Sequence, residues 1–122
     1  MCGIFGYTDK KNLQHYFFEL MKHRGPDARD IKKISQWTLG HLRLSIIDLD
    51  SSSNQPFESD GSTIIYNGEI FNFKQIKNEL LGLGIFFSTD SDTEVLLKSY
   101  EVWGKDCLVK FNGMFSFVII NE

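Results

Sequence analysis

Short segments with the period of a strand alternate along this chain with short segments that have the period of a helix. Residues 39–47 form the clearest strand, because apolar side chains alternate there with the polar side chains of His41, Arg43 and Ser45. Residues 11–22 repeat apolar side chains at helical spacing. Elements this short bury their apolar sides only by packing against one another. We therefore expect an α+β fold built in layers, rather than a regular βαβ alternation.

The other elements are expected from the same periods and from turn residues. Further strands are expected at residues 3–7, 31–37, 62–66 and 85–87, and a buried strand at 114–120. Further helices are expected from about 72 to 82 and from 91 to about 103, and a polar loop at 48–60. Asn72 with Gln75, and Ser91 with Glu94, have the spacing of a capping box at the starts of these helices.

The composition excludes several classes of protein. The 122 residues suffice for one domain with a core, and 13 basic against 16 acidic residues leave a net charge of −3. Neither a nucleic acid nor an anionic membrane is therefore an expected partner. The longest apolar stretch, residues 114–120, is too short to span a bilayer.

The cysteines and histidines give a second set of limits. The chain has only two cysteines and three scattered histidines, with no CxxC pair, so neither a disulfide framework nor a zinc site is expected. Its first residues lack the basic and apolar regions of a secretory signal. We expect a reducing, cytoplasmic setting, with Cys107 as a buried and inert thiol.

Cys2 is a candidate nucleophile because of its position. If Met1 is removed, the thiol of Cys2 lies on the same residue as a free α-amine, whose pKa is about 8. One residue then supplies both a nucleophile and the base that activates it, as in the N-terminal threonine hydrolases. The alternative is a small apolar residue at the start of a strand, and Cys2 alone does not decide between them.

Asn67-Gly68 could supply donors for an oxyanion, from a side-chain amide and from an unshielded backbone N–H. The alternative is a type I′ hairpin turn, which is the usual meaning of Asn-Gly between apolar runs. Here the dipeptide is followed by a helix, which weakens the hairpin interpretation without removing it. Asn112-Gly113 precedes a clear strand and is interpreted as an ordinary turn.

An amino-acid substrate requires a cation for its carboxylate and an anion for its ammonium group. The guanidinium of Arg43 could hold a carboxylate through two hydrogen bonds, and Glu69 and Asp92 could hold the ammonium. The alternatives are a surface ion pair for Arg43 and a helix-start residue favoured by the dipole for Asp92. The residues themselves leave both alternatives open.

Taken together, these motifs resemble the glutaminase domain of class II glutamine amidotransferases, which are N-terminal-nucleophile hydrolases, and within them the asparagine synthetase branch. Gln55-Pro56 and GMFSF at 113–117 also fit the pattern. The blocks that carry the resemblance are MCGIFG at 1–6, HRGPD at 23–27, GHLRLSIID at 40–48, YNGEIFN at 66–72 and SDTEV at 91–95.

The resemblance implies a fold and a reaction. The fold is an αββα sandwich, in which two antiparallel sheets lie between layers of helices. Cys2, as the mature N-terminus, attacks the side-chain amide of glutamine, and Asn67 and Gly68 stabilise the oxyanion. Ammonia leaves, and water hydrolyses the thioester to glutamate. The loop at 23–27 shapes the wall toward the domain that accepts ammonia and is not itself catalytic.

The resemblance also implies a binding set for glutamine. Arg43 binds the carboxylate, Glu69 and Asp92 bind the ammonium, and Leu44 and Ile46 complete the substrate-binding residues. No cofactor is expected in this chain. ATP and magnesium are expected only in a separate synthetase domain or subunit, which is the expected partner, and the oligomeric state stays open.

The chain departs from the family in one respect. It has no Ser-Gly-Gly-x-Asp-Ser loop for ATP, and the family's domain continues past the strand that matches 114–120. We therefore expect residues 1–122 to be an incomplete amidotransferase domain, with an exposed edge or apolar patch.

Three functions stay open at this point. The first is a glutaminase that supplies ammonia to an asparagine-synthetase-like partner. The second is a glutaminase for another acceptor, such as a sugar carboxylate in polysaccharide synthesis. The third is an inactive binding module, which would keep the glutamine pocket without a working thiol.

Overall fold

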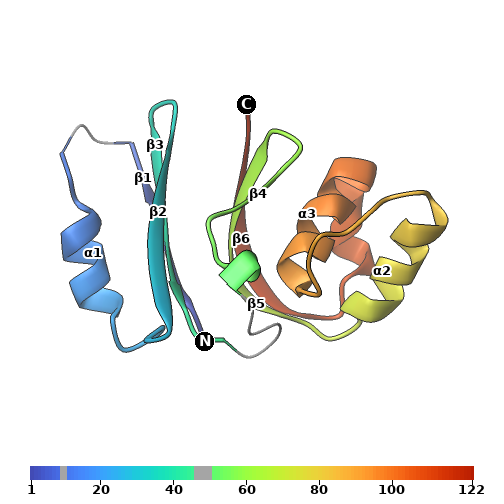
Figure 1. Cartoon of the computed structure of the whole chain (residues 1–122), viewed down its shortest axis with the longest axis horizontal. Coiled ribbons are helices and arrows are strands. Elements are labelled where there is room, and N and C mark those ends of the chain that lie inside the picture. Colours follow the sequence, from blue (N-terminus) through green and yellow to red (C-terminus); the bar gives the residue numbers. More distant parts are fainter. Residues whose placement is uncertain (9–10, 46–50) are drawn as a thin grey trace.

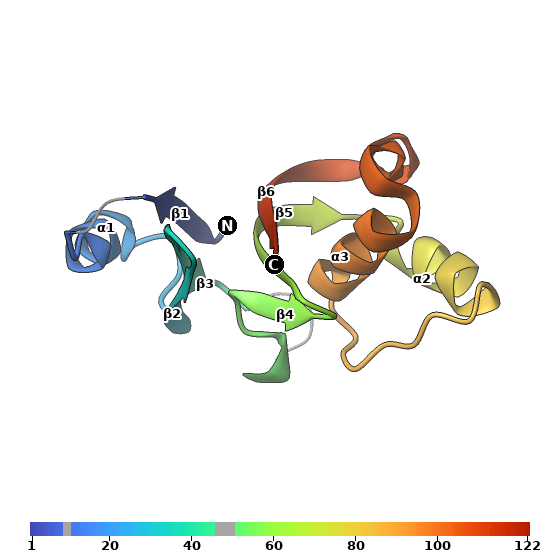
Figure 2. The same ribbon diagram turned by 90° about the horizontal axis from the view of Figure 1, so that it is seen from above.

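The structure is a computed structural model that describes residues 1–8, 11–45 and 51–122. Within these residues, two three-stranded antiparallel sheets pack face to face, and helices cover the outer face of each sheet (Figures 1 and 2). The expected α+β fold, an αββα sandwich, is confirmed.

Each layer is assembled from segments that are distant in the sequence. Sheet A has the order β1-β3-β2, with β1 at Gly3–Tyr7, β3 at Trp37–Arg43 and β2 at Ala28–Ile34. Sheet B has the order β4-β5-β6, with β4 at Phe57–Ser59, β5 at Ser62–Ile70 and β6 at Gly113–Asn121. The helices are α1 at Gln14–Met21, which covers sheet A, and α2 at Phe73–Gly82 and α3 at Asp92–Trp103, which cover sheet B. Short 3-10 turns occur at Ser51–Ser53 and Gly104–Lys110.

The hairpin between β2 and β3 corrects the expected strands at 31–37 and 39–47. β2 ends at Ile34 and β3 already begins at Trp37, so the chain turns at Ser35 and Gln36. Ser35 has a φ of 52°, a left-handed conformation in which glycine or asparagine is usual. Because neither residue type marks the turn, the sequence pattern placed the boundary too late.

The central strand of sheet A, β3, is buried on both of its faces from Thr38 to Arg43. On the outer face, Phe5 stacks on Phe17 of α1 with ring centroids 5.0 Å apart. Gly40 lies directly opposite Phe5, and a Cβ added there would lie 2.1 Å from the phenyl ring. The inner face of β3 carries His41 and Arg43, both buried. The polar side of this strand therefore faces sheet B rather than solvent.

Sheet B and its helices form the larger apolar core. The side of β5 that faces the helices packs against α2 and α3, whose contributing side chains are almost completely buried. These buried residues are Phe57, Ile64, Tyr66, Ile70, Ile76, Leu80, Val95, Leu96 and Leu97. Between the sheets, a smaller cluster of Ile34, Leu39 and Ile65 joins the two halves.

The start of α2 differs from the expected capping box. Asn72 is the N-cap residue, but its side chain makes no cap hydrogen bond. Its amide instead donates to the carbonyl of Lys110 at 2.9 Å and accepts from the Asn112 N–H at 2.9 Å. The side chain therefore ties the beginning of α2 to the segment before β6, which a local spacing rule could not anticipate.

The start of α3 agrees with half of the expected capping box. The Ser91 hydroxyl accepts from the Glu94 N–H at 3.2 Å, as expected. The Glu94 carboxylate accepts from the backbone N–H groups of Ser88 and Thr89 rather than from that of Ser91. Glu94 is 2% exposed, so it holds the preceding loop in place from inside the structure.

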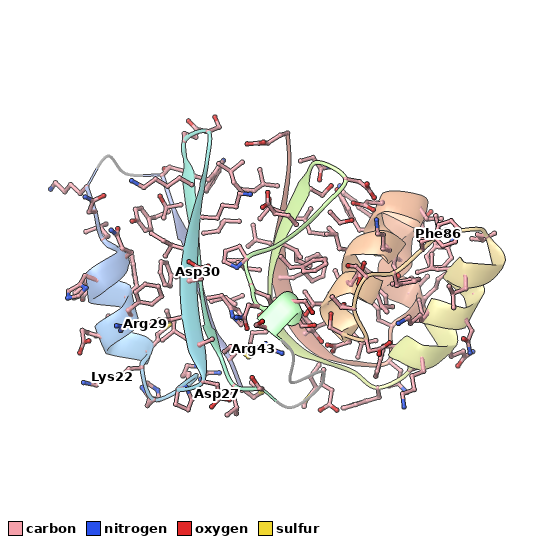
Figure 3. The ribbon with its side chains drawn as sticks, viewed as in Figure 1. Lys22, Asp27, Arg29, Asp30, Arg43 and Phe86 are labelled. Atoms are coloured by element: carbon pink, nitrogen blue, oxygen red, sulfur yellow. The ribbon has the colours of Figure 1, made fainter. Side chains whose placement is uncertain are left out.

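Two expected strands are corrected. Residues 85–87 form no strand, and Phe86 is 85% exposed on the loop between α2 and α3 (Figure 3). Residues 114–120 do form a strand, but β6 is not buried, because Met114 and Val118 are exposed while Phe115 and Phe117 pack on the core. Within the described residues, β6 is at the edge of sheet B. Among the residues that the structure describes, no helix is long and apolar enough to cross a membrane.

Candidate functional site

A pocket lies where the start of β1, the end of β3, the middle of β5 and the first turn of α3 meet. It therefore takes side chains from both sheets and from one helix. Six of the residues predicted to react with or bind a substrate line it, namely Cys2, Arg43, Leu44, Gly68, Glu69 and Asp92. Of the other two predicted residues, Asn67 is not among the residues that line the pocket, and Ile46 lies outside the described residues.

Cys2 is held at both its backbone and its thiol. Its Sγ accepts a hydrogen bond from the Leu44 N–H at 3.3 Å and lies 3.6 Å from the Leu44 carbonyl oxygen. The guanidinium Nε of Arg24 donates to the Cys2 carbonyl at 3.0 Å. Met1 also lines the pocket and is 60% exposed. The thiol is thus fixed at the pocket wall, and the residue before it is accessible.

The loop at 23–27 supports the end of β3. The Asp27 N–H donates to the Arg43 carbonyl at 3.0 Å, and its carboxylate accepts from the Ser45 N–H at 2.7 Å. A Cβ added at Gly25 would lie 2.3 Å from the Leu42 backbone, so only glycine fits there. The loop therefore positions the strand that carries Arg43.

Arg43 is a buried residue rather than an exposed one. Only 6% of it is exposed, and it extends from β3 toward sheet B (Figure 3). One guanidinium nitrogen, Nη1, donates to the Asn54 Oδ1 at 2.6 Å. A buried guanidinium beside a polar pocket is suited to a carboxylate, because the planar group can donate two parallel hydrogen bonds to it.

Asn67 and Gly68 lie inside β5, so the hairpin interpretation is wrong. They pair with Ser116 and Phe115 of β6, and a Cβ at Gly68 would lie 2.1 Å from the Met114 carbonyl oxygen. Gly68 lines the pocket. The side chain of Asn67 shares its face of β5 with Ile65, toward sheet A, and within the described structure its buried Oδ1 has no hydrogen-bond partner. An unpaired buried amide oxygen is costly, but this atom is an acceptor, whereas an oxyanion would be held by the amide NH2 group.

Asp92 is the first residue of α3 and is 6% exposed. Its Oδ2 accepts from the Tyr66 hydroxyl at 2.7 Å and from the Ile70 N–H at 3.2 Å. Burial raises the pKa of this carboxyl, the two hydrogen bonds oppose that rise, and the charge of Glu69 adds to it. Both interpretations of Asp92 therefore hold in part: it begins a helix, and it also lines the pocket.

In the described part of the chain, seven further residues that line the pocket were not predicted as site residues, among them Gln55, Tyr66, Thr93 and Met114. Tyr66, Gln55 and Thr93 line the pocket and are joined by hydrogen bonds, and Met114 lines it from β6. Their part in the site depends on contacts between distant segments. The one available signal was their place inside or beside the motif blocks at 55–56, 66–72, 91–95 and 113–117.

His41 is a buried link between the sheets. Its Nε2 lies 3.2 Å from the Tyr66 carbonyl oxygen, which can only accept, so the nitrogen carries the proton. Burial lowers the pKa of this imidazole to about 4. His41 is therefore neutral near pH 7 and contributes structure rather than charge to the neighbourhood of Arg43.

The comparisons with known proteins agree with this geometry. A family model described as a glutamine amidotransferase domain matches residues 1–122. Asparagine synthetase [glutamine-hydrolyzing] 3 of Bacillus subtilis is 36% identical over 133 residues, covering 100% of this chain and 22% of that protein. Asparagine synthetase B of Escherichia coli is 38% identical over 131 residues, covering 100% of this chain and 23% of that protein. This chain thus spans under a quarter of the length of these relatives.

A solved structure shows the same fold. The glutamine phosphoribosylpyrophosphate amidotransferase from B. subtilis matches 70% of this chain, and 21% of its own, with a TM-score of 0.59 and 27% identity. The family match and the shared fold place the chain in the class of N-terminal-nucleophile glutamine amidotransferases. Within that class, the chain belongs to the glutamine amidotransferase domain family, and it is homologous to the glutaminase domains of asparagine synthetases.

Proposed function

We propose that this chain hydrolyses the side-chain amide of glutamine to glutamate and ammonia. The observation that carries the proposal is the convergence on one pocket of a fixed thiol at Cys2, a buried cation at Arg43 and two carboxylates at Glu69 and Asp92. Cation and carboxylates match the two charges of an amino acid. Cys2, which carries the thiol, lines the same pocket as these charged residues.

The reaction begins with removal of Met1, which frees the α-amine of Cys2. The amine takes the thiol proton, and the sulfur attacks the amide carbon, so a C–S bond forms and the carbonyl electrons move to oxygen. The Gly68 N–H and the Asn67 amide stabilise that oxyanion. The amine returns the proton to the amide nitrogen, the C–N bond breaks, and ammonia leaves.

Water completes the cycle. It adds to the thioester carbon while the α-amine takes one of its protons, and collapse of the second tetrahedral species breaks the C–S bond. Glutamate leaves and the proton returns to sulfur. Arg43 holds the α-carboxylate of the substrate throughout, while Glu69 and Asp92 hold its ammonium, so the amide carbon stays aligned with Sγ.

We further propose that the ammonia passes to an ATP-dependent, asparagine-synthetase-like domain or subunit. The names of the relatives and the fraction of their length that this chain spans support this partner. Any ATP and magnesium would be bound there. A reducing compartment such as the cytoplasm suits the proposal, because Cys2 and Cys107 are both free thiols.

The test is glutamate release by the purified chain, combined with intact-mass analysis. The mass is expected to show loss of Met1, and an electrophilic glutamine analogue is expected to add once, at Cys2. Cys2→Ala should abolish both glutamate release and labelling. Cys107→Ala is the matched control and should retain both, because Cys107 is fully buried away from the pocket.

Two results would contradict the proposal. Glutamate release that survives Cys2→Ala would show that the nucleophile is wrong. Retention of Met1 in a fully active protein would exclude the α-amine as the base, because its nitrogen would be part of a peptide bond.

A further inference from the structure

The Asp92 carboxylate at the pocket is held in place by hydrogen bonds from another element of the fold. The Tyr66 hydroxyl donates to its Oδ2 at 2.7 Å, and the Ile70 N–H donates to the same oxygen at 3.2 Å. Both donors come from β5, whereas Asp92 belongs to α3. Tyr66 is 2% exposed and Asp92 6% exposed. Hydrogen bonds from one sheet thus fix a buried carboxylate that belongs to a helix.

Tyr66 is itself held at three points. Its N–H donates to the Gln55 Oε1 at 2.6 Å, and its carbonyl accepts from the His41 Nε2 at 3.2 Å. Its hydroxyl makes the bond to Asp92. The Gln55 Nε2 continues the network to the Thr93 hydroxyl at 3.1 Å, beside Asp92 on α3. The network therefore joins sheet A, sheet B and α3 at one tyrosine.

We propose, in an inference that rests on the proposed function, that Tyr66 is a positioning residue of the glutamine site. Tyr66 holds the Asp92 carboxylate where the substrate ammonium binds. The phenol is suited to this because burial, and then the adjacent charge of Asp92, raise its pKa far above neutrality. It remains a neutral donor over the working pH range. A donor to a buried carboxylate stabilises the charged form that an ammonium requires.

The charges near Asp92 set the direction of the pH effect. Glu69 on β5 repels its ionised form, and Arg43 on β3 and Cys2, just before β1, line the same pocket. Burial raises the pKa of Asp92, and the Tyr66 hydroxyl opposes that rise. Removing the hydroxyl should therefore raise the pKa further, so that Asp92 loses its charge at a higher pH.

The test is Tyr66→Phe, which removes one oxygen atom and keeps the ring. We expect the KM for glutamine to rise about tenfold, in line with the loss of a hydrogen bond to a charged group, with kcat within about twofold. The acid limb of kcat/KM should move to higher pH. Tyr7→Phe is the matched control, because its hydroxyl donates to the Gln14 Oε1 at 2.8 Å, outside the pocket residues.

Two further measurements separate positioning from a general loss of structure. In an Asp92→Asn background, Tyr66→Phe should add almost no further change in KM, because the two residues act as one unit. If Tyr66→Phe does not fold, site-specific 3-fluorotyrosine at position 66 replaces it. This more acidic phenol is the stronger donor and should move the acid limb to lower pH.

The outcomes separate this inference from the proposed function. If the parent hydrolyses glutamine and both its KM and its acid limb are unchanged in Tyr66→Phe, the positioning role is overturned. If the parent hydrolyses no glutamine, the proposed function fails, and a carbon-13 titration of the Asp92 carboxyl decides the positioning. A pKa that rises in Tyr66→Phe but not in Tyr7→Phe supports it, and an unchanged pKa overturns it.

Discussion

The halves of the sandwich hold their helices in different ways. In the half built on sheet B, α2 and α3 insert side chains such as Leu80 and Leu96, which are 0% exposed, into a continuous core. In the half built on sheet A, α1 has no buried residue and is held mainly by the ring contacts of Phe17 and Phe18 with Phe5. The sheet B half is therefore expected to supply most of the stability.

The site combines the halves unequally. Sheet A supplies Cys2 and Arg43, while the better packed half supplies Gly68, Glu69 and Asp92. The proposed catalysis would therefore depend on how the sheets are held relative to each other, whereas stability is expected to depend mainly on one of them. This difference predicts that stability and activity respond to different substitutions.

The largest expected effect on stability lies in the sheet B core. Leu96→Ala should lower the free energy of unfolding by about 4 kcal/mol, because it leaves a cavity in a fully buried region. Phe17→Ala on the partly buried α1 should cost about 2 kcal/mol, less than the usual cost for a fully buried phenylalanine. Denaturant unfolding monitored by circular dichroism measures both values. Equal losses would contradict the difference between the halves.

The next effect concerns activity rather than stability. Asn67→Ala should raise the barrier to glutamine hydrolysis by about 3 kcal/mol, the usual cost of losing one oxyanion donor. The matched control is Asn112→Ala, since Asn112 belongs to the other Asn-Gly pair of the chain and is exposed. Steady-state kcat compares the two variants. An unchanged kcat in Asn67→Ala would remove Asn67 from the oxyanion site.

The link between the sheets should make stability sensitive to acid. The pKa of His41 is lowered from 6.5 to about 4 in the folded protein, so between these values the unfolded chain binds a proton that the folded chain does not. Stability should therefore be lost as the pH falls from about 6.5 to about 4, by about 2 to 3 kcal/mol in total.

Unfolding measured between pH 7 and pH 4 tests this contribution. His41→Asn should flatten the decline across that range, whereas His15→Gln, at an exposed residue of α1, should leave it unchanged. A decline that persists fully in His41→Asn would assign the acid sensitivity to other groups.

The smallest expected effect concerns a helix cap. Ser91 caps α3 with its hydroxyl, so Ser91→Ala should lower the free energy of unfolding by about 1 kcal/mol. Ser116→Ala, at an exposed residue of β6, should change it by less than about 0.5 kcal/mol. Thermal unfolding of both variants gives the comparison. A loss at Ser91 no larger than that at Ser116 would show that the first turn of α3 is held by packing alone.

Much of the fold was predictable because local periods decide local structure. β1 and the positions of α2 and α3 follow from apolar spacing and helix-end residues. The hairpin at Ser35 was placed wrongly because it contains no glycine or asparagine, and residues 85–87 were wrongly assigned to a strand because an apolar run resembles one. Both errors lie in turns or loops with exposed residues, which a local apolar pattern does not identify.

The sequence predicted many of the residues at the site, but not the hydrogen bonds that hold them in place. The candidates Cys2, Arg43 and Asp92 meet in one pocket, and their catalytic and binding roles remain predictions. The links made by Tyr66 and Gln55 were not predicted, because they join segments 11 to 38 residues apart. No spacing rule reaches across such a distance.

By itself, the sequence determined which residue types lie on which side of each strand and where most helices begin. Only the tertiary structure decided that the polar side of β3 faces inward, that Asn67-Gly68 continues a strand, and that Tyr66 holds Asp92. The physical reason is that a period assigns a side chain to a face. Whether that face meets water, another sheet or a buried carboxylate depends on long-range packing.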